Sequence, residues 1–485
     1  MTLLDRLTLG SDTFPQQHGL FIAGRTIGGT GPSISLTSRR DGRVLAQVAS
    51  AAAADVATAY ECAAQAQRAW ARTTPAARAE VLGRAAQLFR QRADELGEVI
   101  SDEMGKPLGE ARTEVSKGAA ILDYYAQSGY RSIGDMYVTD TGEDVMVFEE
   151  PLGVVALITP WNFPFTLPMR KIAASLATGN AAVFKPATNS ALIGLAIAAT
   201  MHEAGLPPGL LNVIIGRSSV IEHELFTNRH LAGVSLTGSY PTAAAIRRTL
   251  PVEIPFQAEL GGKNPLVIWS DADLNQALDV IAASSFRNNG QICTSCGRLL
   301  VHQDVAPAVL EALRGLIEAR PLVTPDGEYG IMSSDSEDSS IRAVLAEHVT
   351  SMDEVLSSPW PTDRMPPTVL VNPTSSAVLE DEIFGPVITF ETFIDLDDAL
   401  DKANAVSYGL TAGIVTRDLA VAQRFWQEST AGTVKVNAPL TGTPFHTPLE
   451  GFGTSGVGAG EGGGASINFF TRRKAVHMRR PPNGT

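Results

Sequence analysis

Four short apolar runs decide the fold of this chain: VVALI (154–158), AAVF (181–184), NVII (212–215) and GVSL (233–236). Longer stretches with helical apolar periodicity separate them. Short, fully apolar runs that alternate with helices are typical of parallel strands covered by helices on both faces. The pattern therefore predicts a doubly wound α/β unit in this part of the chain.

A second α/β unit is expected downstream. Its predicted strands are NPLVIW (264–269), RLLVH (298–302), PVITF (386–390) and TAGIVT (411–416), with a helix near 273–285. A chain of 485 residues needs more than one such unit, because single hydrophobic cores stop growing beyond about 250–300 residues. The expected fold class is therefore α/β with two doubly wound units.

The segments outside these units have other patterns. Residues 15–48 predict short strands with glycine turns, and residues 51–124 are Ala-rich with helical periodicity. Residues 437–464 form a Gly-rich tract that is too polar and irregular for a core element, whereas 465–480 predict a final strand with a basic end. The expected order is thus a mixed lead-in, two α/β units, a loop and a last strand.

Composition excludes several functional classes. The net charge of -14 repels phosphate backbones and anionic membranes, so neither nucleic acid nor a membrane is an expected partner. No apolar stretch of about 18 residues occurs, and the opening MTLLDRLTLGSD lacks a signal-peptide pattern, so we expect a cytoplasmic protein. Cys62, Cys293 and Cys296 are too few for a disulfide framework and have no histidine at metal-ligand spacing, so no metal site is expected.

Three side chains are candidates for chemistry. Cys293 in GQICTSCGR follows a glycine-containing turn, where backbone amides can lower the pKa of a thiol and make it a nucleophile. Glu259 in AELGGK lies where partial desolvation raises a carboxyl pKa toward that of a general base. Asn162 in TPWNFPF ends a predicted buried strand, and its amide can donate to an oxyanion. Taken singly, each has a structural alternative: a buried cysteine, a loop glutamate and a turn asparagine.

Six motifs occur in order along the chain: PWNFP, FKPA, LTGS, ELGGK, GQIC and EIFGPV. On these motifs the chain resembles the aldehyde dehydrogenase superfamily over about residues 15–478. The resemblance implies that Cys293 is the nucleophile and that Asn162 and the Cys293 backbone N–H hold the oxyanion. It also implies that Glu259 activates the water that releases the acid.

The resemblance also implies how the chain is divided. It predicts a cofactor-binding domain, a catalytic domain, a bridging β element that pairs subunits, and a loop at the substrate entrance. A homodimer or homotetramer is therefore expected. The corresponding residues are 1–124 with 148–258, 259–436, 125–147 with 465–485, and 437–464.

The expected cofactor is NADP or NAD. Lys185 in FKPA matches the family's lysine at the adenosine ribose, and Gly238 and Ser239 in LTGS match the turn beside the pyrophosphate. Many relatives have, three residues after this lysine, a glutamate that repels a 2′-phosphate, but this chain has Thr188. NADP is therefore favoured. The family's usual glycine on the helix after the turn is here Ala243, which adds a methyl group near the pyrophosphate.

The nicotinamide end of the cofactor has its own matching residues. Glu382 and Phe384 in EIFGPV match the residues that hold the nicotinamide ribose and ring, and Trp161 in PWNFP belongs to the same expected site. Without the resemblance, Glu382 would be taken for a loop residue and Phe384 for a core residue. The cofactor assignment therefore rests on the family motifs.

Two arginines indicate the substrate. Arg170 in LPMRKIA and Arg287 in FRNNGQIC match those that bind the substrate carboxylate in succinate-semialdehyde dehydrogenases, and Thr443 lies near the position of a pocket serine. The segments PLGVVALITPWNFP and GGGASINFFTRRKAV are similar to α-ketoglutaric semialdehyde dehydrogenases. We therefore expect a short dicarboxylic semialdehyde as substrate. Glu450, in a loop that departs from the family's PFGG pattern, would oppose an acidic substrate if it faced the tunnel.

Several alternatives stay open. The arginines could form structural ion pairs in an enzyme for aromatic or aliphatic aldehydes, or the chain could be a silent relative with a structural or binding role. A CoA-acylating enzyme is a further alternative, which the base Glu259 disfavours. Cys296, three residues beyond Cys293, could form a reversible disulfide with it.

Overall fold

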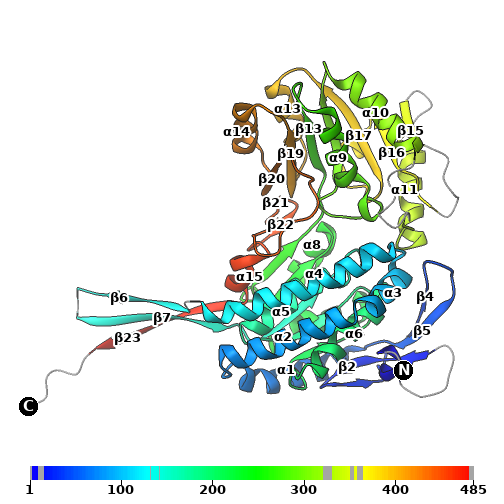
Figure 1. Cartoon of the computed structure of the whole chain (residues 1–485). Helices are drawn as coiled ribbons and strands as arrows, with labels where there is room; N and C mark the ends of the chain where they lie inside the picture. Colours follow the sequence, from blue (N-terminus) through cyan, green and yellow to red (C-terminus); the bar gives the residue numbers. More distant parts are fainter. Residues whose placement is uncertain are drawn as a thin grey trace, which may run out of the picture.

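The computed structural model describes residues 3–8, 16–131, 133–140, 142–319, 330–349, 354–357 and 364–479. The expected α/β fold with two large sheets is confirmed: each sheet forms one lobe, and a β arm projects from one of them (Figure 1). Residues 480–485, the last part of the expected bridging element, lie outside the described residues.

The first lobe is built on an eight-stranded sheet in the order β22-β12-β11-β8-β9-β10-β2-β3. All four apolar runs predicted as strands in this region are strands, and β12, β11, β8, β9 and β10 are mutually parallel. The antiparallel β22, β2 and β3 complete the sheet. The bounds are β2 Leu20–Ile22, β3 Arg25–Ile27, β8 Val154–Ile158, β9 Ala181–Lys185, β10 Leu211–Val213, β11 Leu231–Thr237, β12 Phe256–Glu259 and β22 Gly456–Val457.

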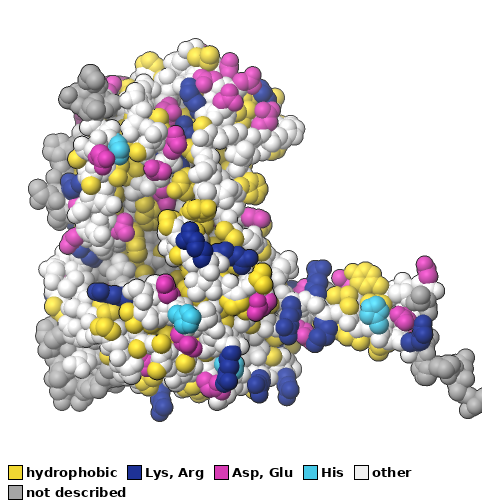
Figure 2. All heavy atoms as spheres, turned by 180° about the vertical axis from the view of Figure 1, so that it is seen from behind, with side chains coloured by type: hydrophobic (Ala, Val, Ile, Leu, Met, Phe, Trp, Pro, Cys, Tyr) yellow, Lys and Arg dark blue, Asp and Glu magenta, His cyan; other side chains and the backbone are white. Residues whose placement is uncertain are grey.

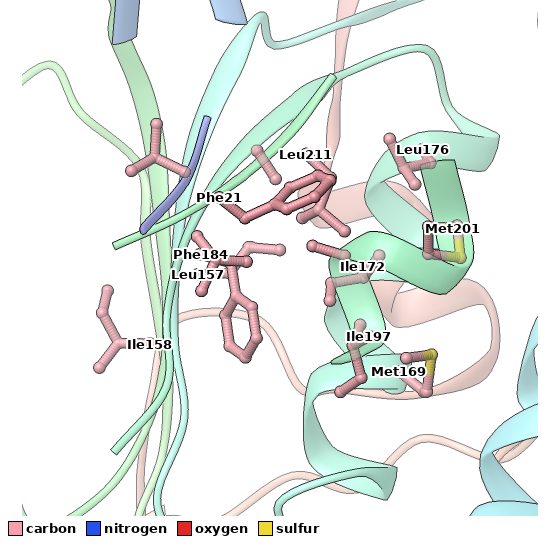
Figure 3. Close-up of a cluster of buried hydrophobic side chains, with 14 of the residues drawn as sticks. Phe21, Leu157, Ile158, Met169, Ile172, Leu176, Phe184, Ile197, Met201 and Leu211 are labelled. Atoms are coloured by element: carbon pink, nitrogen blue, oxygen red, sulfur yellow. The ribbon is translucent and has the colours of Figure 1, made fainter. Parts of the chain in front are cut away.

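Helices pack on both faces of this sheet, as the alternation of runs predicted. In the close-up of Figure 3, Leu157 and Phe184 of the sheet face Met169 and Ile172 on α5 and Ile197 on α6, and all five side chains are fully buried. Burial of such a side chain contributes about 1.5–3 kcal/mol. The helices of the lobe are α1 Ala53–Trp70, α2 Pro75–Gln91, α3 Ala93–Met104, α4 Leu108–Gln127, α5 Thr166–Ala177, α6 Ala191–Glu203, α7 Ser218–Thr227 and α8 Tyr240–Thr249.

The second lobe contains a seven-stranded sheet in the order β15-β16-β17-β14-β13-β19-β20. The strands are parallel except β15, so the second predicted α/β unit is also confirmed. The strands are β13 Asn264–Ile268, β14 Cys296–His302, β15 Glu354–Ser357, β16 Thr368–Val371, β17 Val387–Phe393, β19 Thr411–Val415 and β20 Thr433–Val436. The helices are α9 Leu274–Ser285, α10 Ala306–Ala319, α11 Asp335–His348, α12 Ser376–Glu380, α13 Leu396–Ala403 and α14 Leu419–Glu428.

Three small elements complete the structure. A sheet of β1 Gln16–His18, β5 Val44–Ala49 and β4 Ser33–Thr37 belongs to the lead-in, and the arm consists of β6 Gly134–Val138, β7 Glu143–Pro151 and β23 Thr471–Arg479. The arm stands away from the lobes and carries hydrophobic and charged side chains (Figure 2). Between the lobes lie the short strands β21 Phe452–Gly453 and β22 and the helix α15 Gly463–Phe469, while β18 Tyr408–Gly409 pairs with β21 (Figure 1).

The strand order of the first lobe reverses at β8, and such a reversal is where open α/β sheets form a ligand-binding crevice. The chain proceeds from β8 through β9 to β10 in one direction, and β11 and β12 lie on the other side of β8. Ligands of open α/β sheets bind at such a reversal, beyond the carboxyl ends of the strands. The residues that follow β8, β9, β11 and β12 therefore meet at one edge. No helix in the described part of the chain is long and apolar enough to cross a membrane.

Candidate active site

The loop that carries Cys293 is held by close backbone packing. It follows the 3-10 turn η4 (Arg287–Gly290), in which Gly290 has φ +69° and a Cβ would lie 2.2 Å from the carbonyl oxygen of Gly385. A Cβ on Gly262 would likewise lie 2.9 Å from the carbonyl oxygen of Cys293. The glycines in the ELGGK, GQIC and EIFGPV motifs thus let three distant segments meet.

Asn264 fixes this loop to the second sheet. It lies at the start of β13 with its side chain buried, and its Nδ2 donates to the carbonyl oxygens of Cys293 at 2.8 Å and Ser295 at 2.7 Å. Its Oδ1 accepts from the Thr411 N–H at 3.0 Å. Because both ends of the amide are engaged, Asn264 attaches the Cys293 loop to the start of β13.

Asn162 lies beside the same loop. Its Nδ2 donates to the carbonyl oxygen of Gln291 at 2.9 Å, and its own carbonyl oxygen accepts from Lys106 Nζ at 2.9 Å. One amide hydrogen of Asn162 is therefore used to attach it to the cysteine loop, and the second is free to reach an oxyanion. The Oδ1 atom is buried and has no hydrogen-bond partner in the described part of the chain.

A buried ion pair supports Asn162 from behind. Lys106 bonds Glu114, and both side chains are almost fully buried. The other oxygen of Glu114 accepts from the N–H groups of Phe165 at 2.9 Å and Thr166 at 3.1 Å, at the start of α5. Neither Lys106 nor Glu114 was identified from the sequence, because nothing in their local pattern marks them.

Glu259 occupies the last position of β12 and is buried. Burial and the nearby carboxyl of Glu461 raise the pKa of Glu259 well above its usual range, while Lys171 acts in the opposite direction. The expected direction of this shift is confirmed. The Oε2 atom has no partner in the described residues. A carboxyl with a raised pKa and a free oxygen suits a general base.

Glu461 and Lys171 form a second buried ion pair next to Glu259. Lys171 Nζ bonds Glu461 Oε2 at 2.9 Å and Ser235 Oγ at 2.9 Å. Glu461 lies in the expected entrance loop, which the sequence indicated as irregular. Within that loop β22 pairs with β12, Gly456 opposite Glu259, so part of it belongs to the first sheet.

The expectation for the Cys293 thiol is wrong in direction. Burial raises the pKa of Cys293 to about 12, and the carboxyls of Glu382 and Glu259 add to this effect. Arg170 and the Thr294 N–H lower the pKa by less. The motif indicates the backbone amides that lower the pKa, whereas burial and the two carboxyls act in the opposite direction and outweigh them. Cys296 is buried, and its thiol donates to the Arg298 carbonyl oxygen at 3.4 Å.

Of the three residues that were predicted to bind the substrate, Arg170 and Thr443 are in contact. Arg170 is buried on α5, and its Nη2 donates to the carbonyl oxygen of Thr443 at 2.9 Å. Its Nη1 is buried and has no partner in the described residues. Arg287 is exposed and, like Arg170, forms no ion pair with an acid among the described residues. Glu450 is exposed, and it contributes to the raised pKa of Glu259.

The residues expected at the adenosine end follow the strands that flank the crevice. Lys185 ends β9, and burial lowers the pKa of its amine to about 8. Its side chain donates to no group in the part of the chain that is described, which leaves it available to a ligand. Gly238 follows β11, and the Ser239 side chain caps α8. Thr188 begins the turn after β9, half-buried.

Ala243 is 2% exposed and belongs to the hydrophobic core of the first lobe. At the expected nicotinamide end of the site, the rings of Trp161 and Phe384 form a T-shaped pair with centroids 5.6 Å apart. Phe384 has φ +55°. Glu382 Oε1 accepts from the Gly262 N–H at 3.0 Å, and burial raises its pKa to about 7. Of these residues Glu382 acts on Cys293, because its carboxyl adds to the raised pKa of that thiol.

Comparisons with known proteins identify relatives of this chain. The model of the aldehyde dehydrogenase family matches residues 27–476. The succinate-semialdehyde dehydrogenase of Paenarthrobacter nicotinovorans is 36% identical over 449 residues, covering 90% of this chain and 99% of that protein. The alpha-ketoglutaric semialdehyde dehydrogenase of Bacillus subtilis is 33% identical over 451 residues, covering 90% and 92%.

A solved structure agrees with these matches over nearly the whole chain. A 3,6-anhydro-L-galactose dehydrogenase superposes with a TM-score of 0.91 at 31% identity, covering 96% of this chain and 100% of that one. The resemblance inferred from the six motifs is therefore confirmed. The chain belongs to the aldehyde dehydrogenase family and is an NAD(P)-dependent aldehyde dehydrogenase.

Proposed function

We propose that this enzyme oxidises the semialdehyde of a short dicarboxylic acid, succinic or α-ketoglutaric semialdehyde, to the diacid. The observation that carries the proposal is the buried Nη1 of Arg170, which has no partner in the described residues. A buried guanidinium without an acid is unfavourable unless a ligand supplies one. Arg170 lowers the pKa of Cys293, so a ligand carboxylate bound to Arg170 would lie near the thiol.

In the first step the Cys293 thiol transfers its proton to water. Its sulfur then attacks the aldehyde carbon, so that a C–S bond forms, the C=O π bond breaks and the carbonyl oxygen becomes an oxyanion. The free amide hydrogen of Asn162 and the Cys293 backbone N–H donate to this oxyanion. One such donor is worth about 3–4 kcal/mol. When bound, the oxidised nicotinamide supplies the hydride acceptor. The acyl group then remains on Cys293 as a thioester.

In the second step Glu259 accepts a proton from water, whose oxygen attacks the thioester carbon. The C–S bond breaks, the acid leaves and the Cys293 thiolate is restored. The free Oε2 of Glu259 and its raised pKa support this role. The presence of this base favours hydrolysis over transfer of the acyl group to CoA.

The dinucleotide fits the residues at the crevice. Lys185, with a buried amine that has no partner in the described part of the chain, would hold the adenosine ribose, and Ser239 at the start of α8 would lie beside the pyrophosphate. Glu382, Phe384 and Trp161 would hold the nicotinamide end. Gly238 lies in the turn before α8, where a larger residue would come against Leu236.

We further propose that NADP is preferred over NAD. Thr188 is neutral and half-buried at the point where many relatives carry a glutamate. Without that carboxylate nothing at this position repels a 2′-phosphate. The ratio of kcat/KM for the two cofactors tests this directly.

The arm is the proposed contact between subunits of a homodimer or homotetramer. Its outer strands β6 and β23 are edge strands, and Met136, Tyr137 and Val138 are exposed. Exposed apolar edges are normally covered by another chain. Light scattering should then give a mass at least twice 51.3 kDa, and a monomer would contradict the proposal.

The substrate proposal is tested with a panel of aldehydes and the variant Arg170→Met. Its kcat/KM for succinic semialdehyde should fall about 10- to 100-fold, since a hydrogen bond to a charged group is worth about 1.5–3 kcal/mol. Benzaldehyde and butanal should be little affected. Arg424→Met, an exposed arginine on α14, is the control. Equal losses with all aldehydes would favour an aromatic or aliphatic substrate, and a chain without any turnover would favour a silent relative.

A further inference from the structure

Asn288 lies in a left-handed turn shortly before the nucleophile. It belongs to η4 and has φ +48°. Asn289 and Gly290 follow with φ +55° and +69°, so the left-handed backbone continues up to the start of the Cys293 loop. Glycine adopts this conformation without cost, and asparagine tolerates it better than most other residues. Such a backbone persists where the surrounding contacts hold it.

The side chain of Asn288 joins two segments of the active site. The residue is buried, and its Nδ2 lies 3.3 Å from the backbone carbonyl oxygen of Asn162 and 3.3 Å from that of Gln291. An amide nitrogen carries two hydrogens, so Asn288 can donate one to each carbonyl. Asn162 follows β8 of the first lobe, whereas Asn288 and Gln291 lie between α9 and β14 of the second. The Asn288 amide therefore links the two lobes beside the nucleophile.

The same two carbonyl groups are engaged with Asn162 itself. The Gln291 carbonyl oxygen accepts from Asn162 Nδ2 at 2.9 Å, and the Asn162 carbonyl oxygen also accepts from Lys106 at 2.9 Å. Asn162, Asn288 and Gln291 thus form a closed ring of hydrogen bonds, which includes both the backbone and the side chain of Asn162. The ring holds the Asn162 amide in one orientation relative to the Cys293 loop.

Gln291 fixes the position of this ring. Its backbone N–H donates to the Asn288 carbonyl oxygen at 3.0 Å, and its Nε2 donates to the same oxygen at 3.1 Å. Its Oε1 accepts from the Ser333 N–H at 3.1 Å, just before α11. Because both ends of the Gln291 amide are engaged, the Asn288 carbonyl is held as well. Loss of the Asn288 side chain would therefore remove the link to Asn162 while the turn keeps its other contacts.

We propose that Asn288 is a positioning residue for the oxyanion. By holding the carbonyl groups of Asn162 and Gln291 together, it directs the second amide hydrogen of Asn162 toward the oxygen of the reacting aldehyde. Asn288 acts through Asn162 and does not itself touch the substrate. This inference rests on the oxyanion role proposed for Asn162, but not on which aldehyde is oxidised. A small displacement of an oxyanion donor lowers the rate of the chemical step, because its hydrogen bond forms fully only in the transition state.

Asn288→Gly and Asn289→Gly form a matched pair. Both allow the left-handed backbone and remove a buried amide, but the Nδ2 of Asn289 has no partner in the described part of the chain. Asn288→Gly should lower the single-turnover rate of cofactor reduction about tenfold or more, with butanal and succinic semialdehyde alike. The KM for the cofactor, and the rate of Asn289→Gly, should change less than about threefold. Equal losses in the two variants, or full activity of Asn288→Asp, which cannot donate when ionised, would overturn the proposal.

A double-mutant cycle with Asn162→Ala tests whether Asn288 acts through Asn162. Asn288→Gly should lower the single-turnover rate less than about threefold in the Asn162→Ala background, because the donor that it positions is already absent. The same loss in both backgrounds would show a merely structural role and overturn the proposal. Full activity of Asn162→Ala would refute the oxyanion role and this inference together. Loss of the semialdehyde preference would refute only the proposed substrate, since the cycle is measured with butanal.

Discussion

The Cys293 thiol should react slowly with iodoacetamide in the protein without cofactor. Its pKa is raised from 9.0 to about 12, which corresponds to roughly 4 kcal/mol of bias against the thiolate at about 1.4 kcal/mol per unit. At about pH 8 the thiolate fraction is then near 10⁻⁴, about a thousandfold below that of an ordinary cysteine. The alkylation rate should rise about tenfold per pH unit up to about pH 10 without reaching a plateau.

The variant Glu382→Gln tests the cause of this shift. Glu382 is the largest charged contribution to the raised pKa of Cys293 after burial, so removal of its charge should speed alkylation severalfold. Glu380→Gln, an exposed neighbour on α12, is the matched control. Mass spectrometry of the Cys293 peptide gives the rate, with Cys62 in the same sample as a check on reagent. A plateau below about pH 9, or equal rates in the two variants, would refute the reasoning.

Three further predictions concern the catalytic groups and the cofactor. Glu259→Gln should lower steady-state kcat by about 10²–10⁴ but leave a burst of reduced cofactor, because only the second step needs the base. Stopped-flow absorbance measures both quantities, and loss of the burst would contradict the role assigned to Glu259. Burial raises the pKa of both Cys293 and Glu259, and both groups act when they are deprotonated. The kcat/KM of the wild type should therefore increase with pH from about 6 to 9. A decrease over this range would contradict these roles. Thr188→Glu should lower the NADP-to-NAD ratio of kcat/KM about tenfold or more through repulsion of the 2′-phosphate, and an unchanged ratio would place the phosphate elsewhere.

A fourth change concerns the support of Asn162. Glu114→Gln leaves the buried Lys106 without its counter-charge and should lower the free energy of unfolding by about 3–5 kcal/mol, as measured by urea denaturation. The double variant Lys106→Met, Glu114→Gln should recover most of this loss because it leaves no buried charge. A double variant less stable than the single one would show that the lysine is not paired in this way.

The local sequence determined both sheets. Each apolar run from VVALI to TAGIVT is a strand because a fully buried strand needs apolar residues on both faces, and this property is visible in a window of five residues or so. The motifs also located Cys293, Glu259 and Asn162, whose catalytic roles stay predictions. Parallel strands end at one edge of a sheet. The residues just after β8 and β12 therefore lie at the same edge, regardless of the sequence between these strands.

The charge environment of these groups was decided only by the tertiary structure. Lys171 and Glu461 are 290 positions apart, and Asn162 and Gln291 are 129 apart, so no local pattern relates them. The pKa of Cys293 depends on how much water and which carboxyls surround the thiol, and the motif suggested only the amides. The motifs identify the groups that the chemistry needs, whereas contacts between distant segments determine the electrostatic environment of those groups.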